Sequence, residues 1–283
     1  MKWIFKIALF VLCYCAAERF CKTQLGSFTV HRISSNLTYH PEWEIAPLPP
    51  AELASIKKML QQSYSYFSKG SQSFVFASQD GQYVIKFFRH DHLSAPFFYD
   101  KLPFEWAQRR VAKKTKRLNY DFGSYKLAYE NLKKETGLVF LHLNKTSDLG
   151  QTLDLVDKLG IHHQIPLDDY TFLLQRRASK FYPTLNQMIQ ENCIDEAKKT
   201  LTNLTHLLAL RAQKGLYAKD PNLESNFGII GTDPIQIDVG RFRKKPHKKG
   251  ILCSIRPLRE SLEESCPELS RHLKTEIEKA LGI

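Results

Sequence analysis

Residues 219–240, KDPNLESNFGIIGTDPIQIDVG, hold the feature that most constrains the fold: oxygen-bearing side chains on both sides of a short hairpin. Asp220 and Asn226 lie in a polar loop, and the apolar and turn residues that follow predict two short strands joined by a tight turn. The second strand ends in Asp238-Val239-Gly240. Converging oxygen ligands suit Mg²⁺ bound to a nucleotide, and a further carboxylate can position a hydroxyl. An ordinary surface hairpin is the alternative interpretation.

A second hairpin is predicted upstream, in FSKGSQSFVFASQDGQYVIKFFRH, residues 67–90. Two apolar runs flank the turn residues Gln79-Asp80-Gly81. Lys86 interrupts the second run, and an ammonium group is costly to bury without a partner. Lys86 therefore either points outward at a sheet edge or faces a cleft and meets an anion. A flexible loop containing Gly70 and Ser71 precedes the first strand, and such a loop can close over phosphates that a fixed lysine neutralises.

Together these stretches resemble the protein-kinase-like superfamily. GSQSFVF…YVIKFF looks like its glycine-rich loop and strand lysine, and Asp220…Asn226…Asp238-Val239-Gly240 looks like its catalytic loop and metal-binding Asp-Phe-Gly. The resemblance covers residues 60–245 and is closer to compact bacterial and lipopolysaccharide-kinase-like members than to eukaryotic protein kinases. It implies an α+β fold of two lobes, with an antiparallel-sheet N-lobe and a small, mainly helical C-lobe.

Between the two motifs, SYKLAYENLKKET, residues 124–136, has helical spacing. Ser124 is suited to an N-cap and Gly137 to a C-terminal stop. The resemblance implies that Glu130 is the acidic residue of this helix that holds the strand lysine, with Glu135 as the other candidate. A glutamate that simply faces solvent is the alternative, because helix surfaces are rich in Glu.

The chemistry that the resemblance implies is ATP-dependent phosphoryl transfer to a hydroxyl, with Mg²⁺ as the metal. Such transfer needs mostly positioning and charge stabilisation. The implied roles are Gly70 and Ser71 over the phosphates, Lys86 on the α- and β-phosphates, Glu130 orienting Lys86, Gln175 in the hinge whose backbone meets adenine, Asn226 and Asp238 on Mg²⁺, and Asp220 aligning the attacking hydroxyl and receiving its proton.

Two features depart from the family's pattern. The offset from Asp220 to Asn226 is one residue longer than usual, and Ala218-Lys219 stands where the family has His-Arg or His-Gly. Two hypotheses follow: an active phosphotransferase, or a catalytically weak pseudokinase or membrane-associated scaffold that binds nucleotide or another anion.

The charge balance favours anionic partners. The chain has 41 Lys+Arg against 29 Asp+Glu, a formal net charge of +12, so nucleotide and an acceptor such as an anionic lipid, glycolipid or protein are expected. A basic cluster at 109–117 lies near Trp106, Phe97 and Phe98, a combination that binds anionic lipid or nucleic acid, although a solvated helix face is the alternative. A second cluster at 241–249 falls beside the acceptor in the resemblance. Nucleic acid is not favoured, because only charge supports it.

The first 17 residues, MKWIFKIALFVLCYCAA, begin with lysines and become apolar. The run is shorter than the about 20 residues that a spanning helix needs and suits a signal peptide. An uncleaved anchor and a buried N-terminal helix are the alternatives. We therefore expect a membrane-associated or secreted protein. A cleaved signal would export the chain away from ATP, so an ATP-using enzyme implies an anchor facing the cytosol, delivery into another cell, or no catalysis.

The remaining pattern gives the expected organisation. The cysteines form no framework and are expected to be idle thiols. Helices are expected at Ala51–Tyr64, at 195–214 and in the tail 256–283, strands at 139–143 and 171–175, and a polar loop with a short helix at 147–170. The expected parts are a signal peptide or anchor at 1–17, an irregular segment and extended linker at 18–50, an N-lobe at 51–175 and a reduced C-lobe at 176–283.

Overall fold

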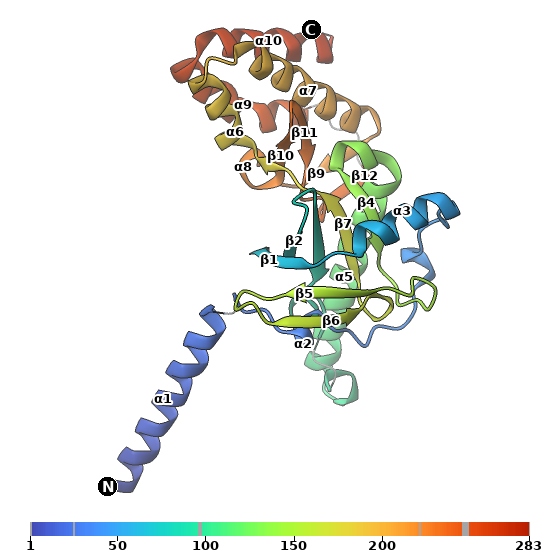
Figure 1. Ribbon diagram of the computed structural model, residues 1–283, viewed down its shortest axis with the longest axis vertical. Helices are drawn as coiled ribbons and strands as arrows, with labels where there is room; N and C mark the ends of the chain where they lie inside the picture. The colour runs from blue at the N-terminus through green and yellow to red at the C-terminus, as the bar shows by residue number, and fades with distance from the viewer. Residues whose placement is uncertain (1, 25, 96–97, 221, 245–248, 283) are drawn as a thin grey trace. The chain divides into compact units, whose positions relative to one another are not determined.

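The computed structural model describes residues 2–24, 26–95, 98–220, 222–244 and 249–282. The chain forms two compact units, one of residues 1–116 with 142–174 and one of residues 117–141 with 175–283. The first is built on a mainly antiparallel sheet and the second is mainly helical (Figure 1). The predicted α+β class is therefore confirmed.

The sheet has the order β4-β7-β3-β2-β1-β5-β6. Residues 138–141 of β4 and 175–176 of β7 belong to the second unit, and the other residues of these strands belong to the first. Alternating apolar residues build the sheet: Phe74, Phe76, Ile85 and Phe87 are fully buried. The rings of Phe74 and Phe76 pack against Phe28, and the ring of Phe87 packs against Phe76. The strands are β1 (Tyr64–Lys69), β2 (Ser73–Ser78), β3 (Tyr83–Phe88), β4 (Leu138–His142), β5 (Thr152–Val156), β6 (His162–Pro166) and β7 (Phe172–Arg176).

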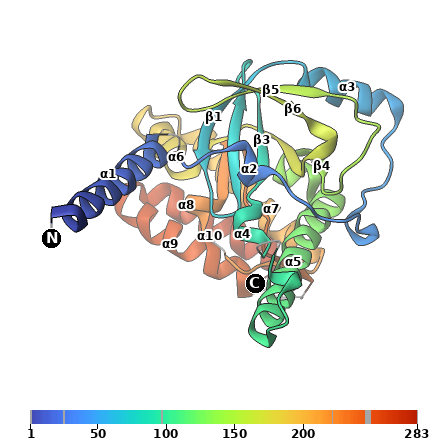
Figure 2. The same ribbon diagram turned by 90° about the horizontal axis from the view of Figure 1, so that it is seen from below.

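The predicted hairpin around Gln79-Asp80-Gly81 is confirmed as β2–β3, paired from Ser73 with Phe88 to Ala77 with Val84. Residues 147–170 were expected to be a loop with a short helix, and this prediction is wrong. They contain the antiparallel pair β5–β6, which lies beside β1 (Figure 2). The sequence TLDLV alternates, with Leu153 and Leu155 fully buried, so a period of two is present but is masked by the surrounding polar residues.

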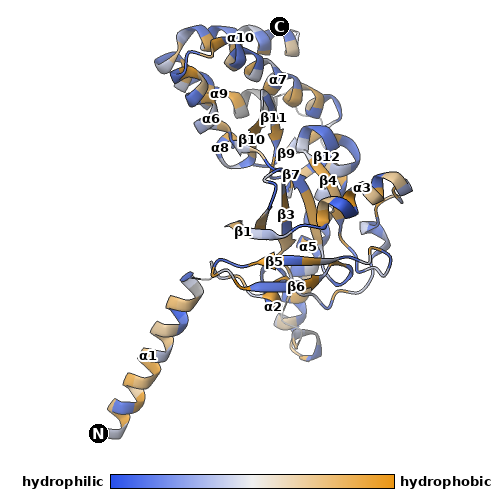
Figure 3. Cartoon of the chain, in the orientation of Figure 1, coloured by the Kyte–Doolittle hydropathy of each residue, from blue (hydrophilic) through white to orange (hydrophobic). Residues whose placement is uncertain are grey.

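The region before the sheet contains α1 (Lys2–Gln24), α2 (Val30–Ile33), η1 (Pro41–Trp43) and α3 (Pro50–Leu60). The segment expected to be an extended linker packs instead: Phe28, Ile33 and Trp43 are buried, and the backbone N–H of His40 donates to Oδ1 of Asn144. Most of α1 is coloured as hydrophobic (Figure 3), and its large apolar side chains, such as Trp3, Phe10 and Leu12, are exposed. Among the described residues, no helix combines the length and the apolarity needed to cross a bilayer.

After β3 come α4 (His90–Leu93), η2 (Tyr99–Lys101) and the long helix α5 (Glu105–Thr136). The helix expected at 124–136 therefore begins 19 residues earlier, at Glu105. Ser124 lies inside it, so the predicted N-cap is wrong. Its hydroxyl donates to the carbonyl of Val239 and accepts from the backbone N–H of Phe242. The polar and basic first half hid the start of the helix, because it lacks a wide apolar face.

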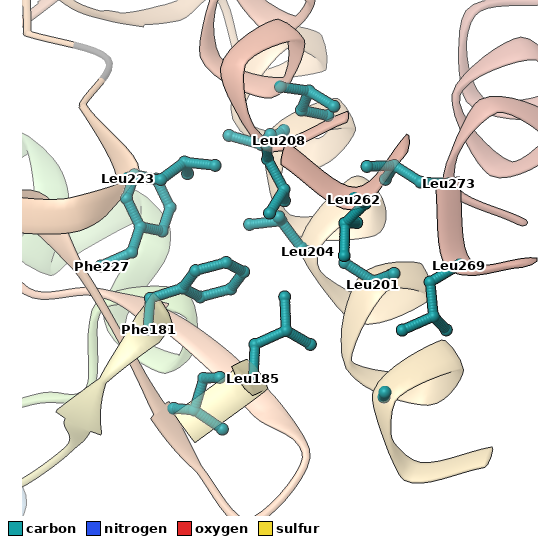
Figure 4. Packing of buried hydrophobic residues seen from close by; sticks show 14 of the residues in the cluster. Phe181, Leu185, Leu201, Leu204, Leu208, Leu223, Phe227, Leu262, Leu269 and Leu273 are labelled. Carbon is teal, nitrogen blue, oxygen red and sulfur yellow. The ribbon is translucent and has the colours of Figure 1, made fainter. Parts of the chain in front are cut away.

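The helices of the second unit pack around one core. Phe181, Leu204 and Phe227 are fully buried in it (Figure 4). The expected helices at 195–214 and in the tail are confirmed, as is the hairpin at 227–237. The elements after β7 are β8 (Ser179–Lys180), α6 (Phe181–Gln190), α7 (Ile194–Gln213), β9 (Leu216–Ala218), α8 (Leu223–Asn226), β10 (Phe227–Ile230), β11 (Asp233–Gln236), β12 (Phe242–Lys244), α9 (Lys249–Ser265) and α10 (Pro267–Leu281). The short helix η3 (Leu167–Asp169) belongs to the first unit.

Candidate functional site

Asn226 is the best-anchored of the candidate metal ligands. It ends the short turn α8, which is N-capped by Asn222, whose Oδ1 accepts from the backbone N–H groups of Glu224 and Ser225. Asn226 is 5% exposed. Its Nδ2 donates to the carbonyl of Asp220 at 3.0 Å, and its Oδ1 accepts from the hydroxyl of Ser225 at 3.0 Å. The amide oxygen keeps a second lone pair with which it can bind a cation.

Asp238 lies directly beside Asn226. The carbonyl of Asn226 accepts from the backbone N–H of Ile237 at 2.8 Å and from that of Asp238 at 3.4 Å. The hairpin β10–β11 therefore brings its two ends together, as the sequence predicted. Asp238 is exposed, and its Oδ1 accepts from the backbone N–H of Gly240 at 3.1 Å. That bond occupies one of about four lone-pair sites of the carboxylate, so Asp238 remains fit to bind a hard cation.

Asp220 is tied to the same place through the backbone. β9, just before it, pairs with β12, just after Gly240, and the N–H of Lys219 donates to the carbonyl of Arg241 at 3.2 Å. The Asp220 side chain is exposed, and its Oδ1 accepts from the N–H of Asn222. The offset of six residues does not separate the two: Nδ2 of Asn226 donates to the carbonyl of Asp220.

A buried chain of hydrogen bonds leads from Arg211 through Gln236 to the main chain of Asp238, and the sequence did not predict it. Arg211 on α7 is 3% exposed, and its Nη1 donates to Oε1 of Gln236 at 2.7 Å. Gln236 is 1% exposed, and its Nε2 donates to the carbonyl of Asp238 at 3.2 Å. Burial lowers the pKa of Arg211 to about 10, which leaves it charged at neutral pH. The signal in the sequence was an arginine within an otherwise apolar helix face.

Helix α5 borders the Asp-Val-Gly segment within the second unit. Ser124 holds it by the two hydrogen bonds described above, and the Tyr120 hydroxyl donates to the carbonyl of Phe242 at 3.2 Å. Asp121 is 3% exposed. Its pKa is raised to about 6, mainly by burial; the charges of Arg117 and Arg241 oppose the shift, and Asp238 adds to it. A second carboxylate therefore lies within electrostatic range of Asp238, which adds to the negative potential that attracts a cation.

The side chain of Gln175 is buried and hydrogen-bonded to the main chain of two other segments. It is 1% exposed, and its Nε2 donates to the carbonyl of Thr136 at 2.6 Å and to that of Ile237 at 3.5 Å. The side chain thus joins β7 to the end of α5 and to the residue before Asp238. Its place in an adenine-binding hinge stays a prediction.

In the first unit, Gly70 and Ser71 form the turn between β1 and β2. Both are exposed, and the N–H of Gly70 donates to the carbonyl of Ser73 at 2.9 Å. Arg89, which is buried, donates from Nη1 to the carbonyl of Gly70 at 3.2 Å and so holds the base of the turn. Lys86 is half-buried on β3, where it pairs with Val75 and points to the face opposite Ile85. Its predicted contact with phosphates stays a prediction.

Glu130 is exposed on α5, and its carboxylate lies 3.9 Å from Nζ of Lys126 on the same helix. Glu135, the other candidate, is half-buried, and this exposure does not show which of the two glutamates pairs with Lys86. The assignment of Glu130 as the partner of Lys86 therefore stays a prediction. Asp121, two and a half turns earlier, is the acidic residue of α5 that is buried.

The remaining predicted features are the metal site, the cysteines and the aromatic and basic clusters. Among the described residues, no three His, Cys, Asp or Glu side chains group closely enough to hold a metal by themselves, so a metal here would rest on Asn226, Asp238 and its own ligands. Cys13, Cys15, Cys21, Cys193 and Cys266 are free thiols. Phe97 and residues 245–248 of the second basic cluster lie outside the described residues.

Comparison with known proteins gives fold-level similarity only. No protein-family model and no curated protein matches the chain. The solved structures that it resembles include WbdD with a kinase inhibitor, at a TM-score of 0.39 and 15% identity over 77% of this chain and 46% of that one. A structure of WbdD described as a bifunctional kinase-methyltransferase has a TM-score of 0.37 and 16% identity, covering 75% and 43% of the two chains. Rv3197 with erythromycin, from Mycobacterium tuberculosis, has a TM-score of 0.31 and 15% identity, covering 97% and 75%.

The chain thus spans less than half the length of the WbdD chains. At these TM-scores and identities, nothing that these proteins bind or catalyse is carried over to this chain. The order of elements is an independent observation: a glycine turn, a lysine strand, a long helix, a strand leading to helices, and an Asn–hairpin–Asp-Val-Gly unit. This order is the one expected from the sequence resemblance to the protein-kinase-like superfamily.

Proposed function

We propose that the chain binds an Mg²⁺–nucleotide and transfers its terminal phosphoryl group to a hydroxyl of an anionic acceptor. One observation carries the proposal: the carbonyl of Asn226 binds the N–H groups of Ile237 and Asp238, and the amide of Asn226 binds the carbonyl of Asp220. A buried amide and an exposed carboxylate are thereby held side by side on backbone that cannot easily separate. Such fixed oxygen ligands are what catalysis of phosphoryl transfer needs from a protein.

In this proposal Asn226 and Asp238 supply ligands to Mg²⁺, which would neutralise the charge on the phosphates. Asp220 aligns the acceptor hydroxyl and receives its proton. Arg211, through Gln236, fixes the main chain of Asp238. The remaining roles are those expected from the resemblance: Lys86 on the phosphates, Glu130 orienting Lys86, Gly70 and Ser71 in the covering loop, and Gln175 in the adenine-binding hinge.

The proposed acceptor class rests on charge. Arg241 and Arg243 follow directly after the Asp-Val-Gly segment, and both are exposed. Arg243 also packs over the Tyr120 ring, with its guanidinium carbon 5.2 Å from the ring centroid. Cations placed next to the proposed metal ligands attract an anionic acceptor such as a glycolipid, an anionic lipid or an acidic protein segment.

The second candidate is a nucleotide-binding protein without efficient transfer. Its supporting observation is the environment of Asp220, whose carboxylate accepts from the backbone of Asn222 in its own loop. Ala218, where the family has His, contributes no polar side chain to this loop. Such a chain would keep the metal ligands and would bind nucleotide as a membrane-associated scaffold.

A transfer assay separates the two candidates. The purified chain is given Mg²⁺ and ATP labelled on its terminal phosphate, with a panel of hydroxyl-bearing glycolipids, phospholipids and acidic peptides. We expect labelled product from wild type and a loss of about a hundredfold or more in Asp220→Asn, because a positioned base contributes about that much. Nucleotide binding with no product from any acceptor, and no hydrolysis, would favour the scaffold. Undiminished turnover in Asp220→Asn would remove Asp220 as the base.

A further inference from the structure

A row of aromatic side chains lies on the surface of the first unit, at the start of α5. The rings of Phe98 and Tyr99 are 4.9 Å apart, those of Tyr99 and Trp106 are 5.5 Å apart, and Phe104 stacks with Trp106 at 6.1 Å and 11° between ring planes. Phe98 is 48% exposed, Phe104 52% and Trp106 54%. We call these four residues the aromatic patch. Tyr99 is half-buried and links the three exposed rings. Single exposed apolar residues are common, but a contiguous group of rings with three of them exposed marks an interaction surface.

Basic side chains continue from the aromatic patch along one face of α5. Trp106, Arg109, Arg110 and Lys113 have the spacing i, i+3, i+4, i+7, which places them on one side of a helix. Arg109, Arg110 and Lys113 are all exposed. Ala107, about 100° round the helix from Trp106, is fully buried, so the side of the helix next to the basic face packs against the protein. The carboxylate of Glu105 pairs with Arg109 at 2.5 Å, which leaves the charges of Arg110 and Lys113 to dominate the centre of the face.

We propose that the aromatic patch and this basic face together bind the surface of a membrane rich in anionic phospholipid. Aromatic rings, with Trp and Tyr foremost, settle at the level of the lipid headgroups, where one side is apolar and the other is wet. Arginine and lysine beside them attract anionic headgroups over about a Debye length. The patch is exposed apolar surface followed by positive charge, and this is the complement of an anionic bilayer surface.

Nucleic acid is the other polyanion that such a face could meet, but the rings are poorly arranged for it. Base stacking needs free ring faces, whereas Phe104 and Trp106 are nearly parallel and cover one face of each other. An anionic bilayer needs only the ring edges and the positive charges. The aromatic patch and the basic face belong to the first unit alone, and membrane binding there does not require the proposed nucleotide site.

Tryptophan fluorescence can test the patch in the full chain. The chain has three tryptophans: Trp3 on α1, Trp43, which is 2% exposed, and Trp106. In a Trp3→Phe chain, Trp106 is therefore the exposed fluorophore. The apolar α1 can carry the chain to vesicles of any charge, but quenching of Trp106 by brominated lipid requires the patch itself to reach the bilayer. Vesicles of brominated phosphatidylcholine are compared with and without an equal share of phosphatidylglycerol.

We expect a blue shift and quenching of Trp106 with the anionic vesicles at low salt, reversed by raising the salt concentration, and little change with neutral vesicles. Arg110→Gln with Lys113→Gln should weaken the anionic-vesicle response about thirtyfold, since each basic side chain near such a surface multiplies binding about fivefold. The matched control is Lys58→Gln with Lys158→Gln, two exposed lysines elsewhere in the same unit, which should bind like the parent.

Three results would overturn the proposal. The first is equal quenching of Trp106 by neutral and anionic vesicles. The second is an Arg110→Gln, Lys113→Gln chain that is correctly folded by circular dichroism and binds like the parent. The third is a Trp106 response to a DNA duplex or single strand with none to vesicles, which would assign the face to nucleic acid.

Discussion

Replacing Gln236 with leucine tests whether the buried chain of hydrogen bonds from Arg211 to Asp238 holds the second unit together. Wild-type Gln236 accepts from Nη1 of Arg211 at 2.7 Å and donates to the carbonyl of Asp238 at 3.2 Å, and both Arg211 and Gln236 are nearly fully buried. Leucine has a similar size but neither accepts nor donates a hydrogen bond. The guanidinium of Arg211 would then lose its acceptor inside the protein, and the main chain of Asp238 would lose a donor.

The magnitude follows from these two bonds. A hydrogen bond from a charged donor contributes about 1.5–3 kcal/mol and a neutral one about 1 kcal/mol. Burying the leucine side chain offsets about 1 kcal/mol. We therefore expect Gln236→Leu to lower the free energy of unfolding by about 1.5–3 kcal/mol. Arg211→Met leaves Oε1 of Gln236 unpaired and should cost about 1–3 kcal/mol. The double variant should cost about 1–2 kcal/mol less than the sum, because the two residues share one bond.

Urea denaturation of wild type, the two single variants and the double variant measures this double-mutant cycle. At a denaturant slope of about 1–3 kcal/mol per molar, the Gln236→Leu loss corresponds to a midpoint about 0.5–3 M lower. The two units can unfold in separate transitions, so the shift is sought in the transition that belongs to the helical unit. A Gln236→Leu midpoint equal to wild type would refute the reasoning, as would strictly additive effects of the two single variants.

Three further predictions concern other parts of the chain. Burial lowers the pKa of His90 from 6.5 to about 4. Because the unfolded state binds the proton more tightly, the free energy of unfolding is largest above pH 6.5 and falls by about 3 kcal/mol as the pH drops toward 4. His90→Phe should flatten this dependence, which denaturation at about pH 7 and about pH 4.5 measures. Gly137→Ala should cost about 2–4 kcal/mol, since φ is +64° and the new Cβ would lie 2.8 Å from Cδ1 of Ile235, whereas Gly160→Ala, at φ +81° with open space, should cost about 1–2 kcal/mol. Lys86→Met should weaken binding of Mg²⁺–ATP about tenfold or more in calorimetry, and unchanged affinity would remove Lys86 from the site.

The sequence was most informative where a short range of residues determines the geometry. The hairpin between Asn226 and Asp238 could be predicted because turn chemistry and alternation act over a few residues. Its consequence, that the two ends of the hairpin meet, follows from the pairing alone. The helix α7 was equally clear, since its apolar positions repeat over several turns.

The missed features depend on contacts between distant residues. Ser124 reads as an N-cap until the hydrogen bonds to Val239 and Phe242, more than a hundred residues away, are known. Arg211 looked like an ordinary helix arginine because its partner, Gln236, is on another element. The segment 18–50 reads as a linker because Phe28 and Trp43 are isolated apolar residues in the sequence. In the fold, Phe28 is buried against Phe74 and Phe76 of the sheet, and Trp43 is buried and stacks with His40.

Binding of Mg²⁺–ATP by Asp238 variants tests the central claim most directly. In a thermal-unfolding assay with ATP, we expect added Mg²⁺ to raise the midpoint of wild type, because a ligand that binds only the native state stabilises it. Asp238→Asn should lose the Mg²⁺-dependent part of this shift. Asp233→Asn, at the turn of the same hairpin, where Oδ1 accepts from Asn203 at 2.9 Å, should keep it. A full Mg²⁺-dependent shift in Asp238→Asn, or none in wild type, would contradict a metal–nucleotide site at the end of this hairpin.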